Sequence, residues 1–198
     1  MNEGSGLTAH DTSGYGNNGA LLPIGSEPTW INGKYGKALS FNGNNYADIA
    51  QNQSLNANSI TFSAWINPSN VSDTQNIISG KWNDLTQFFI YNGKLRVIAR
   101  PTLTTLDFTS NTPLSPNVWY FVTFTYDSST GIGTIYVNGV PDGTGTGEGN
   151  IGALSGVVRI GAQSKPLAQA FKGIIDEVRM YNRQLNQIEI TQLYNAAG

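Results

Sequence analysis

The stretch that decides the fold is Phe171-Lys-Gly-Ile-Ile-Asp-Glu-Val-Arg-Met-Tyr-Asn-Arg-Gln-Leu-Asn-Gln-Ile-Glu-Ile190, near the end of a chain of 198 residues. Its first half predicts a β-strand over Ile174–Tyr181 that carries a carboxylate at Asp176. Alternation along a strand puts Asp176 on the same side as Val178 and Met180, so we expect it to point toward the core. A buried carboxylate needs a cation, hydrogen-bond donors or a proton, and another part of the chain must provide one of them.

A polar loop near the start of the chain, Asp11–Gly19, offers such a partner because it is rich in oxygen atoms and glycine. A metal ion bound between this loop and the last strand would explain both features. In the alternative, Asp11 caps its own turn and Asp176 accepts hydrogen bonds from backbone amides. The two interpretations differ in whether Asp11 and Asp176 lie together in the folded chain.

Composition and charge restrict the classes of protein to which the chain can belong. The net charge is −2 without a basic cluster, which excludes the stripe of lysine and arginine that nucleic-acid binding requires. Without cysteine there is no disulfide and no thiol chemistry, and no apolar segment is long enough for membrane insertion. We expect one domain over residues 1–198, excised from a larger extracellular or cell-surface protein.

Alternation of apolar and polar residues predicts β-strands through most of the chain. The clearest examples are 60–66, in which Ile60, Phe62, Ala64 and Ile66 share one face, and 118–127. The other strand candidates are 37–41, 46–49, 76–81, 87–91, 95–100, 133–137, 157–161 and 174–181.

Turn and cap signals divide these strands and mark one helix. Asn92-Gly93 and Asn138-Gly139 each lie between apolar runs, and both dipeptides suit the positive φ angles of a type I′ hairpin turn. Asn186 and Glu189 have the spacing of a capping box, which predicts a helix as the last element. The whole pattern indicates an all-β fold: a two-sheet antiparallel β-sandwich, or jelly roll, with a short C-terminal helix.

Several motifs, taken in their order along the chain, resemble the laminin-G-like branch of the concanavalin A-like lectin/glucanase superfamily. They are Asp11–Gly19, Gly36–Gly43, Ile60–Ile66, Trp119–Asp127, Ile135–Gly139 and Phe171–Leu185. The resemblance covers nearly the whole chain and implies two antiparallel sheets, with the opening loop near the last strand. This fold hosts lectins, enzymes and adhesion modules, so the resemblance implies a fold more strongly than a function.

The resemblance also implies a structural calcium ion between the opening loop and the last strand. Two carboxylates would provide side-chain oxygens and the loop would provide backbone carbonyls, since Ca²⁺ prefers oxygen ligands. The candidate metal ligands are Asp11, Ser13, Tyr15, Asn18 and Asp176.

The sequence provides little for catalysis. His10 is the single histidine, and no serine lies in a Gly-x-Ser-x-Gly motif, which argues against the usual nucleophile triads. A glycosidase needs two carboxylates that face each other, whereas the adjacent Asp176 and Glu177 point to opposite faces of a strand. We expect no enzymatic activity. The alternative is a glycosidase or lyase whose carboxylates are brought together by folding alone.

Sugar binding has more support, because sugars are recognised by stacking on aromatic rings and by hydrogen bonds to their hydroxyls. Residues of this kind occur in the 81–88 segment and at outward positions of nearby strands. The candidate ligand contacts are Trp82, Asn83, Asp84, Gln87, Trp65, Arg96, Arg100 and Tyr136. In the alternative, Trp65 and Trp119 stand where the resemblance implies aromatics kept for packing, and Tyr136 packs under an edge loop. The two arginines are then solvated strand charges that discourage edge pairing.

We expect a noncatalytic module that binds a polysaccharide or glycan, is accessory to an extracellular protein and is stabilised by calcium. Such a module contacts its ligand through a small area, which predicts an affinity of about micromolar to millimolar. The competing interpretation is a protein-interaction, adhesion or spacer module of a surface or phage structural protein.

Overall fold

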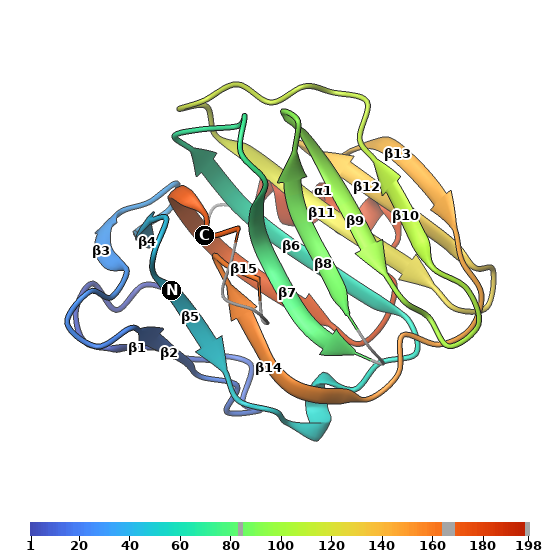
Figure 1. Cartoon of the computed structure of the whole chain (residues 1–198), viewed down its shortest axis with the longest axis horizontal. Helices are drawn as coiled ribbons and strands as arrows, with labels where there is room; N and C mark the ends of the chain where they lie inside the picture. The colour runs from blue at the N-terminus through green and yellow to red at the C-terminus, as the bar shows by residue number, and fades with distance from the viewer. Residues whose placement is uncertain (83–84, 164–168, 197–198) are drawn as a thin grey trace.

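Two antiparallel β-sheets packed face to face form the body of the protein in the computed structural model, which describes residues 1–82, 85–163 and 169–196 (Figure 1). In these residues one sheet has eight strands in the order β1-β2-β5-β14-β7-β8-β9-β10. The other has seven strands in the order β13-β12-β11-β6-β15-β4-β3. The predicted all-β sandwich with a short C-terminal helix is confirmed.

The two sheets are assembled from hairpins, such as β7 with β8 and β8 with β9, and from long-range pairs, such as β6 with β15. In chain order the described elements are β1 (Thr8–Ala9), β2 (Gly19–Leu22), β3 (Thr29–Asn32), β4 (Lys37–Asn42), β5 (Tyr46–Ile49), the 3₁₀ turn η1 (Gln53–Leu55), β6 (Ile60–Pro68), β7 (Gln75–Trp82), β8 (Thr86–Tyr91), β9 (Lys94–Ala99), β10 (Leu106–Thr109), β11 (Tyr120–Asp127), β12 (Ile132–Val137), β13 (Val140–Thr146), β14 (Leu154–Ile160), β15 (Lys172–Tyr181) and α1 (Gln187–Asn195).

The hydrophobic core lies between the sheets and is built from alternate residues of the strands. Phe62 and Ala64 of β6 pair directly with Phe124 and Val122 of β11, and all four are fully buried in the core. Phe88 of β8, in the facing sheet, packs on Phe124 with ring centroids 6.3 Å apart. The alternation predicted for 60–66 is confirmed, because the same parity that appears in the sequence faces the core. That predicted for 118–127 is confirmed over β11, whereas Val118 lies before the strand and is 43% exposed.

Both predicted hairpin turns have the expected backbone conformation. Between β8 and β9, Asn92 has φ 49° and Gly93 has φ 76°. Between β12 and β13, Asn138 has φ 51° and Gly139 has φ 80°. Positive φ at both central residues is the requirement of a type I′ turn, so this prediction is confirmed.

Strand β15 contains a bulge that reverses the predicted direction of Asp176. Its pairing with β6 shifts register after Asp176, and Glu177 lies in the left-handed region with φ 48°. Val178 and Met180 pack against the core, whereas Asp176 pairs with Trp65 on the outward side of the sheet. The prediction that Asp176 points toward the core is therefore wrong, because an extra residue changes the parity between its two sides.

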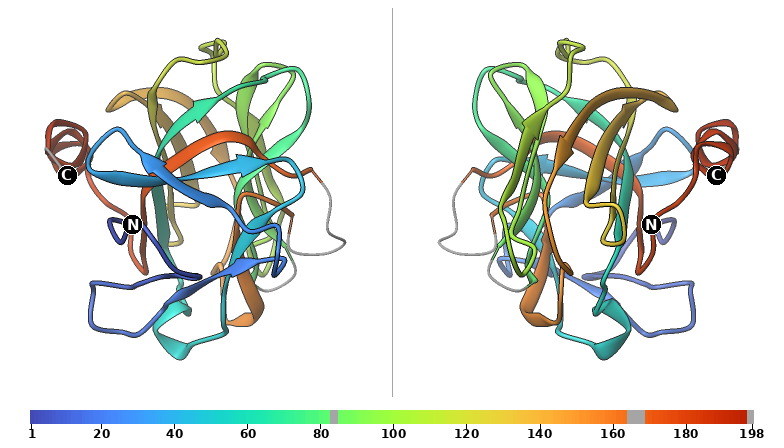
Figure 2. Two further views of the ribbon diagram at one scale, coloured as in Figure 1. Left: turned by 90° about the vertical axis from the view of Figure 1, so that its left-hand side faces the viewer. Right: turned by 90° about the vertical axis from the view of Figure 1, so that its right-hand side faces the viewer.

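Helix α1 lies across the outward face of the seven-stranded sheet, on the far side from the core (Figure 2). Its Ile190 packs in a cluster with Trp65, Phe121 and Tyr136 of the sheet. Tyr194 stacks on Trp65 with ring centroids 5.6 Å apart. This face therefore carries a second, smaller apolar cluster. Within the described residues no helix is long and apolar enough to cross a membrane.

The start of α1 is stabilised by the predicted capping box, which makes it sensitive to acid. Asn186 accepts a hydrogen bond from the Glu189 amide, and the Glu189 carboxylate accepts bonds from Asn186 N and from Arg183. The Arg183 guanidinium, and then the Asn186 amide, lower the pKa of Glu189 from 4.5 to about 2. Because this pKa is depressed in the folded state, the stabilisation is present above pH 4.5 and is lost as pH falls through about 2.

We expect the carboxyl carbon of Glu189 to titrate by NMR with a midpoint of about 2 in the wild-type protein. In Arg183→Gln the midpoint should rise toward the ordinary value of 4.5, and the amides of the first turn of α1 should shift over the same pH range. A wild-type midpoint near 4.5 would contradict the ion pair.

Candidate functional site

Trp82, the predicted stacking residue, belongs to the core. The end of β7 turns its indole inward, where it is fully buried and its ring centroid lies 5.4 Å from that of Phe62. Its Nε1–H donates a 2.6 Å hydrogen bond to the Leu55 carbonyl oxygen, which satisfies the polar group of the side chain. The prediction that Trp82 contacts a ligand is therefore wrong. Asn83 and Asp84, also predicted contacts, lie outside the described residues.

Trp65 and Tyr136 point away from the sandwich core, as alternation predicts, but they are 5% and 7% exposed. Both pack in the cluster beneath helix α1. Alternation in the sequence predicts which side of the sheet a strand residue faces, but not which other element covers that side. The prediction that these two residues contact a ligand is wrong, and the alternative in which they pack within the fold is confirmed.

A row of polar residues crosses the outward face of the eight-stranded sheet. The register pairs Asp48 with Arg159, Arg159 with Ser79, and Ser79 with Gln87. Arg159 Nε and Nη2 donate to the two Asp48 oxygens at 2.6 and 2.8 Å, and the guanidinium lies 3.9 Å from the Tyr46 ring centroid. Sequence reasoning missed Asp48, Ser79 and Arg159. Their alternation with core residues in the strands predicted at 46–49, 76–81 and 157–161 is the signal that could have found them.

Most of this row is enclosed by protein. Ser79 Oγ donates to the Ala162 carbonyl at 3.0 Å, and Gln87 Nε2 donates to Asn76 Oδ1 at 3.1 Å. Asn76 Nδ2 in turn donates to the side chain of Gln169 at 2.9 Å. The predicted contact Gln87 therefore lies on an outward face but is 4% exposed, and its amide is already used within the protein. The prediction that Gln87 contacts a ligand is wrong for this reason.

The open part of the same face lies on β8, β9 and β10. We call Phe89, Tyr91, Arg96 and Asp107 the Tyr91 cluster, in which Phe89 is buried beneath the other three at 3% exposure. Arg96 Nε and Nη2 donate to the two Asp107 oxygens at 2.8 and 2.7 Å. The guanidinium carbon lies 4.8 Å from the Tyr91 ring centroid and 5.9 Å from that of Phe89. Tyr91 is 37% exposed, so the cluster presents an aromatic surface to solvent.

The charges of this cluster are held in place by each other. The hydrogen bond with Asp107 raises the pKa of Arg96, which stays charged. A guanidinium has five N–H donors and a carboxylate has several acceptor sites, so the bidentate pair leaves both kinds of group for a ligand. Of the predicted contacts, Arg96 lies within the cluster and Arg100 is exposed just after β9. Phe89, Tyr91 and Asp107 were missed.

The two carboxylates predicted to share calcium have separate partners in different sheets. Asp11 follows β1, an edge strand of the eight-stranded sheet, and accepts hydrogen bonds of 2.8–2.9 Å from Ser13 and Asn17. Asp176 belongs to the seven-stranded sheet and accepts a 3.1 Å bond from the Tyr35 amide. The hydrogen bonds expected in the alternative are therefore present at both carboxylates, and these contacts give no support to a cation shared by Asp11 and Asp176, which stays a prediction.

These surroundings do not suit Ca²⁺, because a calcium site needs converging oxygen lone pairs and these carboxylates face N–H and O–H donors. The other predicted ligands are similarly used: Asn18 Oδ1 accepts the Asp11 N–H at 2.8 Å, and the Tyr15 carbonyl accepts from Asn52 at 3.2 Å. Ser13 Oγ donates to Asp11. Across the part of the chain that the structure describes, no three His, Cys, Asp or Glu residues form a metal-binding group.

We therefore expect removal of divalent metals to leave the stability of the protein unchanged. Dialysis against EDTA should shift the melting temperature by less than about 1 °C, since protein donors already satisfy Asp11 and Asp176. A metal that binds the native state alone would add stability by mass action. A fall of several degrees in EDTA, restored by added calcium, would show that the calcium predicted from the family resemblance is present after all.

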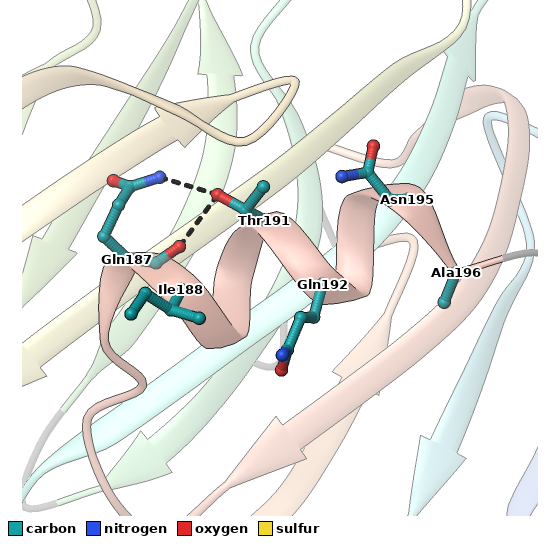
Figure 3. A pocket seen from close by; sticks show the side chains of 6 residues that line it. All are labelled: Gln187, Ile188, Thr191, Gln192, Asn195 and Ala196. Atoms are coloured by element: carbon teal, nitrogen blue, oxygen red, sulfur yellow. Dashed lines mark hydrogen bonds between the residues drawn. The ribbon is translucent and has the colours of Figure 1, made fainter.

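A shallow depression of approximately 430 Å³ lies on the outer side of helix α1 (Figure 3). It is lined by Gln187, Ile188, Thr191, Gln192, Asn195 and Ala196. Gln187 Nε2 donates to Thr191 Oγ1 at 3.1 Å within this lining. The lining has no charged side chain and lies over the opposite sheet from the Tyr91 cluster, so it is not part of the candidate site.

The fold defines a concanavalin A-like β-sandwich, and comparison with known proteins agrees. A family model of the laminin-G-like type, described as the concanavalin A-like lectin/glucanases superfamily, matches residues 41–191. The chain belongs to this superfamily, which confirms the resemblance seen in its motifs. No curated protein sequence matches the chain.

Solved structures share the fold at low sequence identity. Domain 4 of AbnA, a GH43 extracellular arabinanase from Geobacillus stearothermophilus, in complex with arabinotriose, has a TM-score of 0.78 and 20% identity over 93% of this chain and 91% of that chain. The binding domain of Paraclostridial Mosquitocidal Protein 1 has a TM-score of 0.70 and 18% identity, over 94% of this chain and 49% of that chain. A Trypanosoma rangeli sialidase has a TM-score of 0.70 and 16% identity, over 98% of this chain and 31% of that chain. At these identities the likeness shows the fold alone.

Proposed function

We propose that this chain is a noncatalytic carbohydrate-binding module of an extracellular or cell-surface protein, and that a sugar of its glycan ligand binds at the Tyr91 cluster. The observation that carries the proposal is the exposed arrangement of Tyr91, Arg96 and Asp107 on the outward face of the eight-stranded sheet. Membership of a lectin/glucanase superfamily and the likeness to a domain in complex with arabinotriose support a glycan as the class of ligand.

The cluster combines the two interactions by which proteins hold sugars. The exposed part of the Tyr91 ring can stack on the C–H face of a sugar ring. The N–H groups of Arg96 that Asp107 does not use can donate to sugar hydroxyls, and the Asp107 oxygens can accept from them. Because the contact is small and desolvation of hydroxyls offsets part of the gain, we expect an affinity of about micromolar to millimolar.

The carboxylates of this face are better suited to binding than to catalysis. Glycoside hydrolysis needs one carboxyl group that donates a proton and a second one on the other side of the scissile bond. Asp107 and Asp48 each accept two hydrogen bonds from a guanidinium, that of Arg96 and that of Arg159. Both oxygens of each carboxylate are thus already engaged by a guanidinium, which supports a noncatalytic role.

Replacing Tyr91 by alanine removes the stacking surface without opening the core. We expect glycan binding to weaken about tenfold or more, while the melting temperature stays within about 2 °C of the wild-type value. Binding is measured by calorimetry, first with arabinotriose and then with oligosaccharides selected on a glycan array. Tyr15→Ala is the matched control, because Tyr15 is 68% exposed on a loop remote from the cluster.

The outcomes of this experiment separate the competing functions. Equal binding by Tyr91→Ala and the wild-type protein would contradict the proposed site. A silent array would favour a protein-interaction, adhesion or spacer module. Release of sugar from a polysaccharide panel would favour a glycosidase or lyase over a binding module.

A further inference from the structure

The outward face of the seven-stranded sheet carries a second group of aromatic and polar side chains beside the part that α1 covers. Trp119 directly precedes β11 and packs against the cluster that contains Trp65 and Phe121. The Tyr35 ring meets Trp65 edge to face with centroids 5.9 Å apart, and Lys34 Nζ lies 4.7 Å from the centre of the Trp65 ring. Trp119 and Tyr35 are half-buried and Lys34 is exposed, so solvent reaches all three.

The pairing of β6 with β11 adds an amide to this group. Continued by one residue, its register makes Asn67 the neighbour of Trp119 on the outward side of the sheet. We call Lys34, Tyr35, Asn67 and Trp119 the Trp119 patch. Among the described residues, the Asn67 amide, the Tyr35 hydroxyl and the Trp119 indole N–H have no hydrogen-bond partner. Asn67 adjoins Trp119, and Tyr35 and Lys34 contact the neighbouring Trp65, so the polar groups of this face are available to a ligand.

The Trp119 patch also carries a positive charge that no nearby carboxylate neutralises. Lys34 forms no ion pair within the described residues. The two carboxylates of β15 at the level of Trp65 have other partners, since Asp176 accepts the Tyr35 backbone N–H and Glu177 pairs with Arg179 at 2.6 Å. In a chain whose net charge is −2, this local positive charge favours a ligand that brings its own carboxylate.

We propose that the Trp119 patch binds an acidic sugar, a uronic-acid residue within a glycan chain. The C–H face of the sugar ring stacks on Trp119, its hydroxyls bond to Asn67 and Tyr35, and its carboxylate pairs with Lys34. A neutral sugar would leave the ammonium unpaired, and an acidic peptide lacks the flat C–H face that the indole accepts. This site goes beyond the function proposed above, because it lies on the opposite sheet from the Tyr91 cluster and selects a charged sugar.

The test is an NMR titration of the whole ¹⁵N-labelled chain with trigalacturonate, and with galactotriose as its neutral counterpart. We expect the indole N–H signal of Trp119 and the amides of Lys34 and Tyr35 to shift. Trigalacturonate should bind about tenfold more tightly than galactotriose, and added salt should reduce the difference. Lys34→Gln should remove this preference without changing the melting temperature. Lys94→Gln, on the opposite sheet, is the matched control and should keep it.

Two results would overturn the inference directly: an unchanged Trp119 indole signal at millimolar trigalacturonate, or equal affinity for the two trisaccharides. Triglutamate that shifts the same signals as strongly would indicate acidic peptides and would overturn it as well. Trp119→Ala should abolish the shifts of Lys34 and Tyr35, and Trp119→Phe should restore binding in part if the ring stacks. Tyr91→Ala should leave binding at the Trp119 patch unaffected. A failure of the inference about this patch can therefore be distinguished from a failure of the function proposed for the Tyr91 cluster.

Discussion

Trp82→Ala is expected to lower the free energy of unfolding by about 3–5 kcal/mol, the usual cost of removing a fully buried large aromatic side chain. The indole has no exposed surface, packs on Phe62 and bonds to the Leu55 carbonyl, so its loss leaves a cavity and an unpaired acceptor. For a chain of this size the melting temperature should fall by roughly 6–20 °C. Thermal and urea unfolding, followed by tryptophan fluorescence and circular dichroism, measure both quantities.

The same variant separates a core role from a ligand-binding role. Trp82→Phe keeps most of the buried ring and should recover more than half of the lost stability. Trp30→Ala is the comparison, because Trp30 is partly exposed and also bonds to a backbone carbonyl, that of Gly6. A Trp82→Ala protein that melts like the wild type but no longer binds glycan would contradict the structure and would restore Trp82 as a ligand contact.

Asp176→Ala is expected to cost about 2–4 kcal/mol, because it leaves two partly buried backbone donors without an acceptor and empties a buried position. The Asp176 carboxylate is fully buried and accepts the amides of Tyr35 and Glu177 at 3.1 and 2.8 Å. It thereby ties the loop between β3 and β4 to the bulge of β15. Asp11→Ala is the matched control: its carboxylate also accepts several bonds, but water can replace them, so we expect a cost of about 1 kcal/mol or less.

The contribution of Asp176 to stability changes with pH in the opposite direction to that of Glu189. Burial raises the pKa of Asp176 above its ordinary value of 3.8, although the amides of Tyr35 and Glu177 act in the other direction. Its contribution to stability is therefore complete below pH 3.8 and is lost as pH rises through the raised folded-state pKa. Asp176→Asn does not titrate, so the stability of the wild type relative to this variant should fall over that range. A difference that rises with pH would contradict the assignment.

Alternation along the chain was sufficient to predict the sandwich, because the parity of a strand is a local property. The same inward residues of β6 and β11 that alternate in the sequence form the core, and the Asn-Gly pairs turn where they were expected. The parity of Asp176 failed because the bulge places Glu177 at positive φ, and no glycine or asparagine marks that position in the sequence. The alternation of residues therefore predicted the two-sheet architecture but not the bulge in β15.

The candidate site was harder to predict because it depends on contacts between distant segments. Trp65 and Tyr136 were assigned the correct side of their strands, but helix α1, far along the chain, covers them. Arg159 and Asp48 are 111 residues apart and meet through strand pairing that no local pattern reveals. Arg96 was found as an outward charge, whereas its environment of Tyr91 and Asp107 depends on the order of β8, β9 and β10. Whether a predicted residue belongs to the site was therefore decided by the element that covers it and by the strand that pairs with it, and not by its residue type.

The central claim is that a glycan binds on the outward face of β8, β9 and β10. The most direct measurement is a ¹H–¹⁵N NMR titration with the neutral oligosaccharide that gives the strongest glycan-array signal. The structure predicts amide shifts concentrated at Phe89–Tyr91, Arg96 and Asp107, with the Trp82 indole signal unchanged. Shifts confined to other surfaces, or the absence of any neutral oligosaccharide that binds at millimolar concentration, would contradict it.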